Sequence, residues 1–304
     1  MGKKGKKAQA GKPKKLTPKD IGKQLDVLVK KLEEELTGAD LFAPLPPTED
    51  CPICLVPVSR INSEQRYRTC CGNVICGACY NENEAAINKQ NEKNSKKVAF
   101  TCPFCREPDP TNTEYVSRLQ ARCKKNDHNA LTMMGERYHD LEEFQGEVYR
   151  KGGTVKDDLK ALDCFIRAVG LGSPAACVKI GVSYLEGIGV AVDKERAALF
   201  QRVGALRGSV VARYSIGYSE YFNLGNHEIG IRHWKIAAEA GYQPSLDMLR
   251  EMYNADGDLP GKEFITKEYL DSAYRSCHEA QMEINSEERE KHGYQGMRIE
   301  LGQG

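Results

Sequence analysis

The fold class follows from the segment at residues 176–208, ACVKIGVSYLEGIGVAVDKERAALFQRVGALRG. It opens with two small residues at helical spacing, Ala176 and Gly181, and then reaches the turn Glu186-Gly187-Ile188-Gly189-Val190. A second helical pattern follows the turn, at Ala197, Phe200, Gly204 and Gly208. Small residues let two antiparallel helices approach each other closely. The stretch therefore predicts a pair of packed helices joined by a glycine-rich turn.

The same pattern recurs on both sides of this stretch. The small pair is Ala130 and Gly135 in the unit before it, and Ala212 and Gly217 in the unit after it. The second helix of these units is marked by Ala161, Phe165, Ala168 and Gly172, and by Gly230, Trp234, Ala237 and Gly241. A fourth, weaker unit covers residues 245–274, with Arg250 in place of the small residue. Stacked helix pairs form a solenoid, so we predict a mainly α fold, an α-solenoid over residues 112–286.

Three further features of this half are expected. The first unit carries an insertion around residues 145–154, and residues 287–304 form a C-terminal tail. The aromatic residues of the units are assigned to the core: Trp234, Phe165, Phe200, Tyr184 and Tyr221. Residues 115–123 favour a helix that joins the solenoid to the preceding segment without a flexible hinge.

The repeated units resemble the Sel-one-like (Sel1-like) repeat, a relative of the tetratricopeptide repeat. The resemblance covers about half of the chain and rests on the small pairs and the second-helix positions quoted above. It implies a curved helical scaffold whose concave face binds protein partners. A partner or substrate of this chain, not identified by the sequence, is therefore expected on the repeats.

The N-terminal region contains two segments of opposite character. Residues 1–16 are rich in lysine and glycine and contain no acidic residue, which predicts a disordered basic arm. Without interleaved aromatic residues, this arm is not expected to read nucleic acid. Thr17 and Pro18 then provide a helix start, and an apolar residue recurs every three or four positions at Ile21, Leu25, Leu28, Leu32 and Leu36. Residues 17–38 are thus expected to form an amphipathic helix that docks on the body or on a partner chain.

Composition limits the environment of the protein. Lysine plus arginine (44) nearly equals aspartate plus glutamate (43) in the 304 residues, so no overall charge directs the chain to nucleic acid or membrane. No run of apolar residues is long enough to span a bilayer. We expect a cytoplasmic or nuclear protein. Disulfides are rare in such reducing compartments, so closely spaced cysteines are more typical of metal ligands.

Eight of the 12 cysteines fall in residues 48–109. They form three Cys-x-x-Cys pairs and one adjacent pair: Cys51 and Cys54, Cys70 and Cys71, Cys76 and Cys79, Cys102 and Cys105. A Cys-x-x-Cys pair chelates one zinc, and a closed structural site needs four ligands, so eight ligands predict two structural zinc ions. Residues 81–97 contain few large apolar side chains, and metal binding would supply folding energy there instead. Cys123, Cys164, Cys177 and Cys277 are scattered and are expected to be buried core residues.

The order of these cysteines resembles the RING domain, whose ligands alternate between two zincs. The resemblance implies that Cys51, Cys54, Cys76 and Cys79 hold the first zinc, and that Cys70, Cys71, Cys102 and Cys105 hold the second. Asn73 stands where the family usually has a histidine, so the adjacent Cys70 and Cys71 are inferred ligands, as in all-cysteine members.

The RING resemblance also implies a function. RING modules that act as ubiquitin ligases bind a ubiquitin-conjugating enzyme and orient its ubiquitin thioester, without a nucleophile of their own. Ile53, Pro103 and Arg106 match the family's contact positions for the conjugating enzyme and ubiquitin. Asn83 departs from the family, because a bulky apolar residue is usual there, with Tyr80 and Ile87 as substitutes. The sequence therefore favours a RING-type ubiquitin ligase, and its alternative is a non-enzymatic scaffold stapled by two zincs.

Overall fold

The structure is a computed structural model that describes residues 16–61, 65–93, 97–139, 157–257 and 259–282. Residues 1–15 of the predicted arm, the insertion at 145–154 and the tail at 287–304 lie outside these ranges. None of the described helices is long and apolar enough to cross a membrane.

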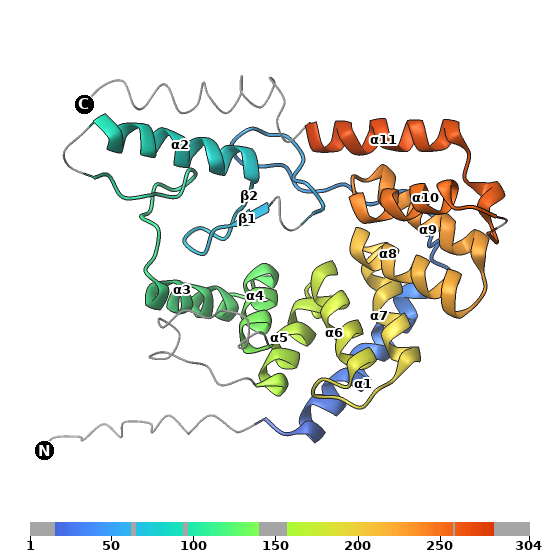
Figure 1. The fold of residues 1–304 in the computed structure, drawn as a ribbon. Helices are drawn as coiled ribbons and strands as arrows, with labels where there is room; N and C mark the ends of the chain where they lie inside the picture. The colour runs from blue at the N-terminus through green and yellow to red at the C-terminus, as the bar shows by residue number, and fades with distance from the viewer. Residues whose placement is uncertain (1–15, 62–64, 94–96, 140–156, 258, 283–304) are drawn as a thin grey trace, which may run out of the picture.

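The described chain is a succession of helices interrupted by one small antiparallel sheet (Figure 1). The elements are α1 (Pro18–Leu36), β1 (Gln65–Tyr67), β2 (Val74–Cys76), α2 (Gly77–Lys93), α3 (Asn112–Lys124), α4 (His128–His139), α5 (Asp158–Gly170), α6 (Pro174–Glu186), α7 (Lys194–Leu206), α8 (Val210–Tyr218), the π-helical turn η3 (Ser219–Asn223), α9 (His227–Glu239), α10 (Gln243–Asn254), the 3-10 turn η4 (Lys262–Phe264) and α11 (Lys267–Met282). The mainly α prediction is confirmed.

Helices α3 to α11 pack against their neighbours in sequence order, as a solenoid requires. The closest pairs are α4 with α5, α6 with α7, and α8 with α9, which are the predicted helix pairs. The turns between successive pairs each contain a left-handed residue, namely Asn126, Gly172, Gly208 and Gly241. Such a residue ends a helix and lets the chain reverse into the next unit. The aromatic residues assigned to the core are buried.

The small residues of the repeat allow helices to touch through their backbones. A Cβ atom added to Gly217 would lie 2.6 Å from Trp234 Nε1 and 2.9 Å from the carbonyl oxygen of Gly230. Gly135 is equally tight, because an added Cβ would lie 2.4 Å from the Phe165 ring. Gly181 is looser, with its nearest neighbour at 3.4 Å. Close helix contact is therefore strongest in the first and third units.

The substitution Gly217→Ala is expected to lower the free energy of unfolding by about 1–3 kcal/mol, because the new methyl group overpacks the α8–α9 contact. Gly22→Ala is the matched control, since a Cβ at this helical glycine meets nothing within 4 Å. It should raise the free energy of unfolding by about 0.5–1 kcal/mol through helix propensity. Urea unfolding of both variants measures the difference, and equal stability of the two would contradict the proposed contact.

Helix α1 docks on the body through its predicted apolar stripe. Ile21, Leu25 and Leu32 are fully buried, and the helix packs against α5 and α7, the second helices of two successive units (Figure 1). Two ion pairs flank the stripe: Glu35 accepts two hydrogen bonds from Arg207, and Asp26 pairs with Arg196. The sequence left open whether this stripe docks on the body of the chain or on a partner chain. In the structure it is buried against the body of the same chain.

The linker that follows α1 runs along the solenoid and is held by arginines. The guanidinium of Arg213, which is 1% exposed, donates a 2.6 Å hydrogen bond to the carbonyl oxygen of Leu41. The ring of Phe42 lies against Arg232 and His233 of α9, with the Arg232 guanidinium carbon 3.9 Å from the ring centroid. These contacts direct the chain from α1 to the cysteine segment along a fixed path.

The buried His233 predicts a dependence of stability on pH. Burial, together with the neighbouring charges of Arg213, Arg202 and Arg232, lowers the pKa of His233 from 6.5 to about 4. Between these two values the unfolded chain binds a proton that the folded chain does not, so stability falls as the pH falls through this window. From pH 7 to pH 5, the wild type should lose roughly 2 kcal/mol more than the variant His233→Gln. Urea unfolding at both pH values measures this difference, and equal losses would exclude His233 as its source.

Candidate metal centre

The eight cysteines of residues 48–109 gather into two groups of four, which we call the first and second quartets. The sulfur atoms within each group lie within 4.8 Å of one another. The first quartet contains Cys51, Cys54, Cys76 and Cys79, and the second contains Cys70, Cys71, Cys102 and Cys105. This is the same alternating grouping that the RING resemblance implied. None of the 12 cysteines, all of which lie in the residues that the structure describes, forms a disulfide, so none competes for these sulfurs.

The loops around the first and last Cys-x-x-Cys pairs, residues 50–57 and 101–108, are built in the same way, and we call them the first and last knuckles. In the first, the N–H of Cys51 donates to Val56 O at 2.9 Å, and the N–H of Leu55 donates to Cys51 O at 2.9 Å. In the last, the corresponding bonds join Cys102 to Glu107 and Arg106 to Cys102, at 2.8 and 2.9 Å. Each knuckle closes with an isolated antiparallel bridge. Both loops therefore present two cysteine sulfurs on one side of a tight turn.

The residue after each of these two Cys-x-x-Cys pairs adopts an unusual backbone conformation. Leu55 has φ +59° and Arg106 has φ +64°, in the left-handed region that favours glycine. A non-glycine residue there costs on the order of 1–2 kcal/mol. Strain of this kind concentrates at functional sites, and the side chain of Leu55 is also 72% exposed. These two positions are therefore candidates for contact with another molecule.

The remaining cysteines of the two quartets come from the small sheet, the loop that joins its strands and the start of α2. Strands β1 and β2 pair in antiparallel fashion, and Cys76 ends β2 directly before α2. The N–H of Cys79, in the first turn of α2, points at the sulfur of Cys76 at 3.5 Å. Between the strands, the N–H of Gly72 donates to Arg68 O at 2.7 Å, and Gly72 has φ +81°. This tight loop brings the adjacent Cys70 and Cys71 into one quartet.

The quartets fit a thiophilic divalent metal. A tetrahedral zinc with Zn–S bonds of ~2.3 Å places neighbouring sulfurs ~3.8 Å apart. The separations here are 3.8 Å between Cys54 and Cys76, 4.0 Å between Cys71 and Cys102, and 3.4 Å between Cys70 and Cys105. Asn73 lies outside both quartets, and its backbone oxygen instead accepts a bond from the N–H of Arg68. The donor sets are therefore four sulfurs each.

The thiols of each quartet strongly perturb one another. The pKa of Cys51 is lowered far below its usual range by hydrogen bonds from the thiols of Cys76 and Cys79, while the same contact with Cys51 raises the pKa of Cys79. Burial raises the pKa of Cys70 to about 12. Burial also opposes ionisation of Cys102, but backbone hydrogen bonds from Cys105 and Phe104 outweigh it and lower its pKa to about 7. Four neighbouring thiols cannot all ionise without a cation between them.

The predicted contact residues occupy different environments. Arg106 is exposed, Ile53 is half-buried and Pro103 is buried. Two exposed apolar side chains that the sequence reasoning missed lie beside them, Leu55 and the 46% exposed Phe104. The available signal was an apolar residue inside or directly after a Cys-x-x-Cys pair in a polar loop. The apolar surface of the two knuckles is therefore supplied mainly by Leu55, Ile53 and Phe104.

Helix α2 explains why an asparagine stands at position 83. The side chain of Asn83 is buried, and its Nδ2 donates a 2.9 Å hydrogen bond to the carbonyl oxygen of Thr101, in the last knuckle. Ile87 is also buried, and Tyr80 stacks beneath Arg66 and Arg68. Asn83 thus ties α2 to the last knuckle in place of an exposed apolar residue.

The four scattered cysteines are core residues, as predicted. Cys123, Cys164, Cys177 and Cys277 are all at most 8% exposed. Burial raises the pKa of Cys123 to about 11 and that of Cys164 to about 12. The thiols of Cys123 and Cys164 therefore stay protonated and unreactive near neutral pH.

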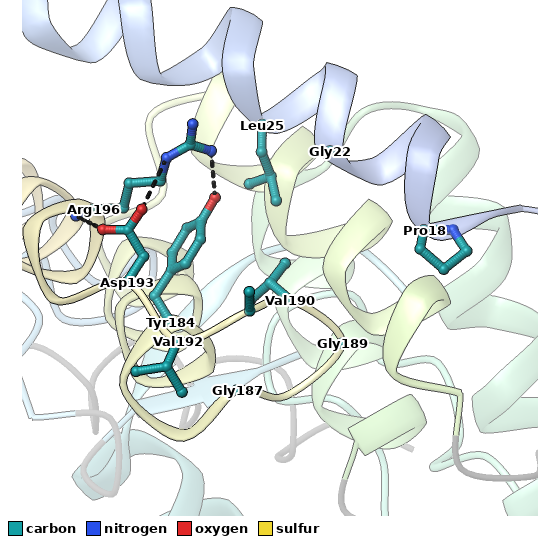
Figure 2. A pocket seen from close by; sticks show the side chains of 11 residues that line it. Pro18, Gly22, Leu25, Tyr184, Gly187, Gly189, Val190, Val192, Asp193 and Arg196 are labelled. Atoms are coloured by element: carbon teal, nitrogen blue, oxygen red, sulfur yellow. Dashed lines mark hydrogen bonds and ion pairs between the residues drawn. The ribbon is translucent and has the colours of Figure 1, made fainter.

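The solenoid has a pocket of its own, about 480 Å³ in volume, between α1 and the turn from α6 to α7 (Figure 2). Arg196 is its main polar group and donates to Tyr184 Oη at 3.1 Å, while also pairing with Asp193 and Asp26. The charge of Arg196 is thus balanced by the two aspartates. A ligand in this pocket would therefore be bound mainly through apolar contacts and fit of shape.

Part of the chain is similar to a known repeat protein. The chain is 30% identical over 105 residues to a putative sel1-like repeat-containing protein, L21, of Acanthamoeba polyphaga mimivirus. That alignment covers 34% of this chain and 19% of the mimivirus protein, so the chain spans about a fifth of the length of this relative. This similarity supports Sel1-like repeats, which are suited to binding other proteins. No protein-family model matches the chain.

Two solved structures are also similar to part of the chain. The Sel1 repeat protein from Oxalobacter formigenes is 24% identical, with a TM-score of 0.45, over 58% of this chain and 67% of that chain. The protective antigen c5321 of uropathogenic Escherichia coli, which displays an SLR fold, is 23% identical with a TM-score of 0.40, over 56% and 33% of the two chains.

The left-handed conformation of Leu55 leads to a test of the knuckle geometry. Leu55→Gly should leave the free energy of unfolding unchanged or raise it by up to about 1 kcal/mol, because glycine adopts this backbone without strain. Val56→Gly, one residue along the same loop and at negative φ, should instead lower it by about 1 kcal/mol. Thermal unfolding compares the two variants. An equal loss in both would argue against strain at Leu55.

Proposed function

We propose that each quartet holds one zinc ion and that residues 48–109, which we call the cysteine module, form a RING-type ubiquitin ligase. The observation that carries the proposal is the alternating grouping of the two quartets, with sulfur separations that suit tetrahedral zinc. Bound zinc would act structurally, by neutralising the thiolates and joining segments that share little apolar core. The module brings no nucleophile to the reaction.

The residues of the knuckles would then act by binding and orientation. Ile53, Leu55 and Phe104 would contact the ubiquitin-conjugating enzyme, and the buried Pro103 would shape the last knuckle from inside. The guanidinium of the exposed Arg106 would donate hydrogen bonds to the conjugating enzyme and ubiquitin, fixing the thioester in a reactive pose. The left-handed backbone at Arg106 supports this role. If position 106 served only to close the turn, glycine would adopt this conformation with less strain than arginine.

The helical repeats would hold a partner or substrate protein. The surface we propose for it is the exposed apolar patch around η3, made of Tyr218, Phe222, Leu224 and Ile229. Tyr218 and Phe222 lie in contact, with ring centroids 4.7 Å apart, and both are about half exposed. Clustered exposed aromatic residues are typical of protein interfaces, and π-helical turns are frequent at functional sites.

A second candidate function is a non-enzymatic scaffold in which the module only stiffens the solenoid. The fixed attachment of the module favours this reading. Tyr67 donates a 2.7 Å hydrogen bond to Asp127 at the start of the solenoid, and Arg60 reaches the carbonyl oxygen of Gly208 two units further along. A module that spans several units in this way would restrict their bending.

Reconstituted ubiquitination separates the two functions. The assay contains activating enzyme, a panel of conjugating enzymes and ubiquitin, and in it the wild type should form ubiquitin chains. The variants Ile53→Ala, Leu55→Ala and Arg106→Ala should each reduce the rate of chain formation about tenfold or more. A tenfold loss corresponds to about 1.4 kcal/mol of lost transition-state stabilisation. Val27→Ala is the control, because Val27 is also 72% exposed but lies on α1.

Native mass spectrometry of the same samples should count two zinc ions per chain. Chain formation by none of the conjugating enzymes would exclude the ligase and leave the scaffold. Fewer than two zincs would instead contradict the proposed metal centre.

A further inference from the structure

The loop that carries Cys70 and Cys71 is held from outside the cysteine module. Arg122, in the last turn of α3, donates from Nη2 to the carbonyl oxygen of Cys70 at 2.6 Å and from Nε to that of Thr69 at 3.3 Å. Beside it, the hydroxyl of Tyr67 donates to Asp127, which precedes α4. Helix α3 of the solenoid thus forms a hydrogen bond with the backbone of Cys70, a predicted metal ligand.

The loop is shaped to receive this arginine. A Cβ atom added to Gly72 would lie 2.5 Å from Nη1 of Arg122 and 3.0 Å from Oδ2 of Asp127. Gly72 also needs its left-handed backbone to close the turn after the two cysteines. The glycine therefore serves both the tight turn and the contact with α3.

The two quartets differ in how much they depend on such support. All four cysteines of the first quartet are buried, whereas Cys105 of the second is exposed and Cys70 and Cys71 are half-buried. Adjacent cysteines on one metal also require a particular backbone geometry. Hydrogen bonds that orient ligand residues typically change metal affinity by about 10–100-fold. The second quartet, which is only partly buried and contains an adjacent ligand pair, should rely on such bonds most.

The positive charge of Arg122 should also stabilise metal binding by the second quartet. Four thiolates around one divalent ion leave a net charge of −2, which favours nearby cations. Arg68, within the module, forms an ion pair with Asp109. Arg122 adds a second guanidinium on the side of the loop that faces the solenoid.

We propose that Arg122 is a positioning residue of the second quartet, so that helix α3 of the solenoid forms part of the outer shell of this metal site. The inference rests on the proposed function in one respect, because it takes the quartet to hold zinc. The end of α3 and the start of α4, which we call the α3–α4 corner, dock on the loop of Cys70 and Cys71 through Arg122 and Asp127. Metal binding by the second quartet and docking of this corner are then thermodynamically linked, and each favours the other. Zinc in the second quartet stabilises the corner, and the docked corner retains the zinc.

The test uses the full chain loaded with zinc and a series of increasing chelator concentrations. Native mass spectrometry counts the bound metal, and alkylation followed by peptide mapping identifies which cysteines have become free. In the wild type, the second quartet should lose its zinc before the first. In Arg122→Met, the chelator concentration that empties the second quartet should fall about 10–100-fold, with the first quartet unchanged. Arg122→Lys should restore part of the loss, because it keeps the charge but not the two-pronged donor.

The control is Arg118→Met, one helical turn earlier on α3. Arg118 donates to the carbonyl oxygen of Pro108 and pairs with Glu107, so it contacts the module without touching a ligand residue. This variant should lose zinc as the wild type does. Hydrogen exchange should in turn show faster exchange in α3 and α4 once the second quartet is emptied.

The outcomes distinguish the inference from the proposal beneath it. A wild type with fewer than two zincs would overturn the metal centre and the inference with it. Two zincs in the wild type and an unchanged second quartet in Arg122→Met would overturn the inference alone. Equal weakening of both quartets would also overturn it, since Arg122 would then act on folding in general.

Discussion

Burial of the apolar stripe of α1 fixes how the N-terminal part of the chain is placed on the solenoid. By packing across α5 and α7, this helix joins two successive repeats and fixes the starting point of the linker. Arg213 and the Phe42 contacts then guide the linker along the solenoid. The cysteine module follows at a defined place, although it precedes the repeats in the sequence. A freely tethered module would have had no such position.

The module and the solenoid are therefore one arrangement rather than two independent parts. The loop of Cys70 and Cys71 meets the start of the solenoid through Tyr67 and Arg122, and Arg60 reaches Gly208 further along. Most of these contacts join a side chain to a backbone carbonyl group. Such bonds satisfy the irregular backbone of loops that lack secondary structure. They also make the geometry of a cysteine loop depend on helices outside it.

Most of the candidate site could be predicted from residue spacing. Cys-x-x-Cys pairs chelate through local geometry, and the structure brings Cys70 and Cys71 into the second quartet as the family pattern implied. Exposure was harder to foresee. The sequence pointed to Pro103, which is buried, and passed over Leu55 and Phe104, which are exposed. Asn83 looked like a defect in a docking groove, but it forms a buried hydrogen bond to Thr101. Solvent exposure depends on which segments meet in space, and spacing alone does not contain that information.

The helix pairs, the close contacts at small residues and the cysteine knuckles could all be predicted from the amino-acid sequence alone. Each of these follows from interactions within about one repeat or one turn of chain, where residue type and spacing are sufficient. The folded structure was needed to establish that α1 docks on its own chain, that the linker follows the solenoid and that Arg122 reaches the backbone of Cys70. These contacts join residues far apart in the chain. An apolar stripe or an arginine is equally suited to several partners, and the folded geometry selects one of them.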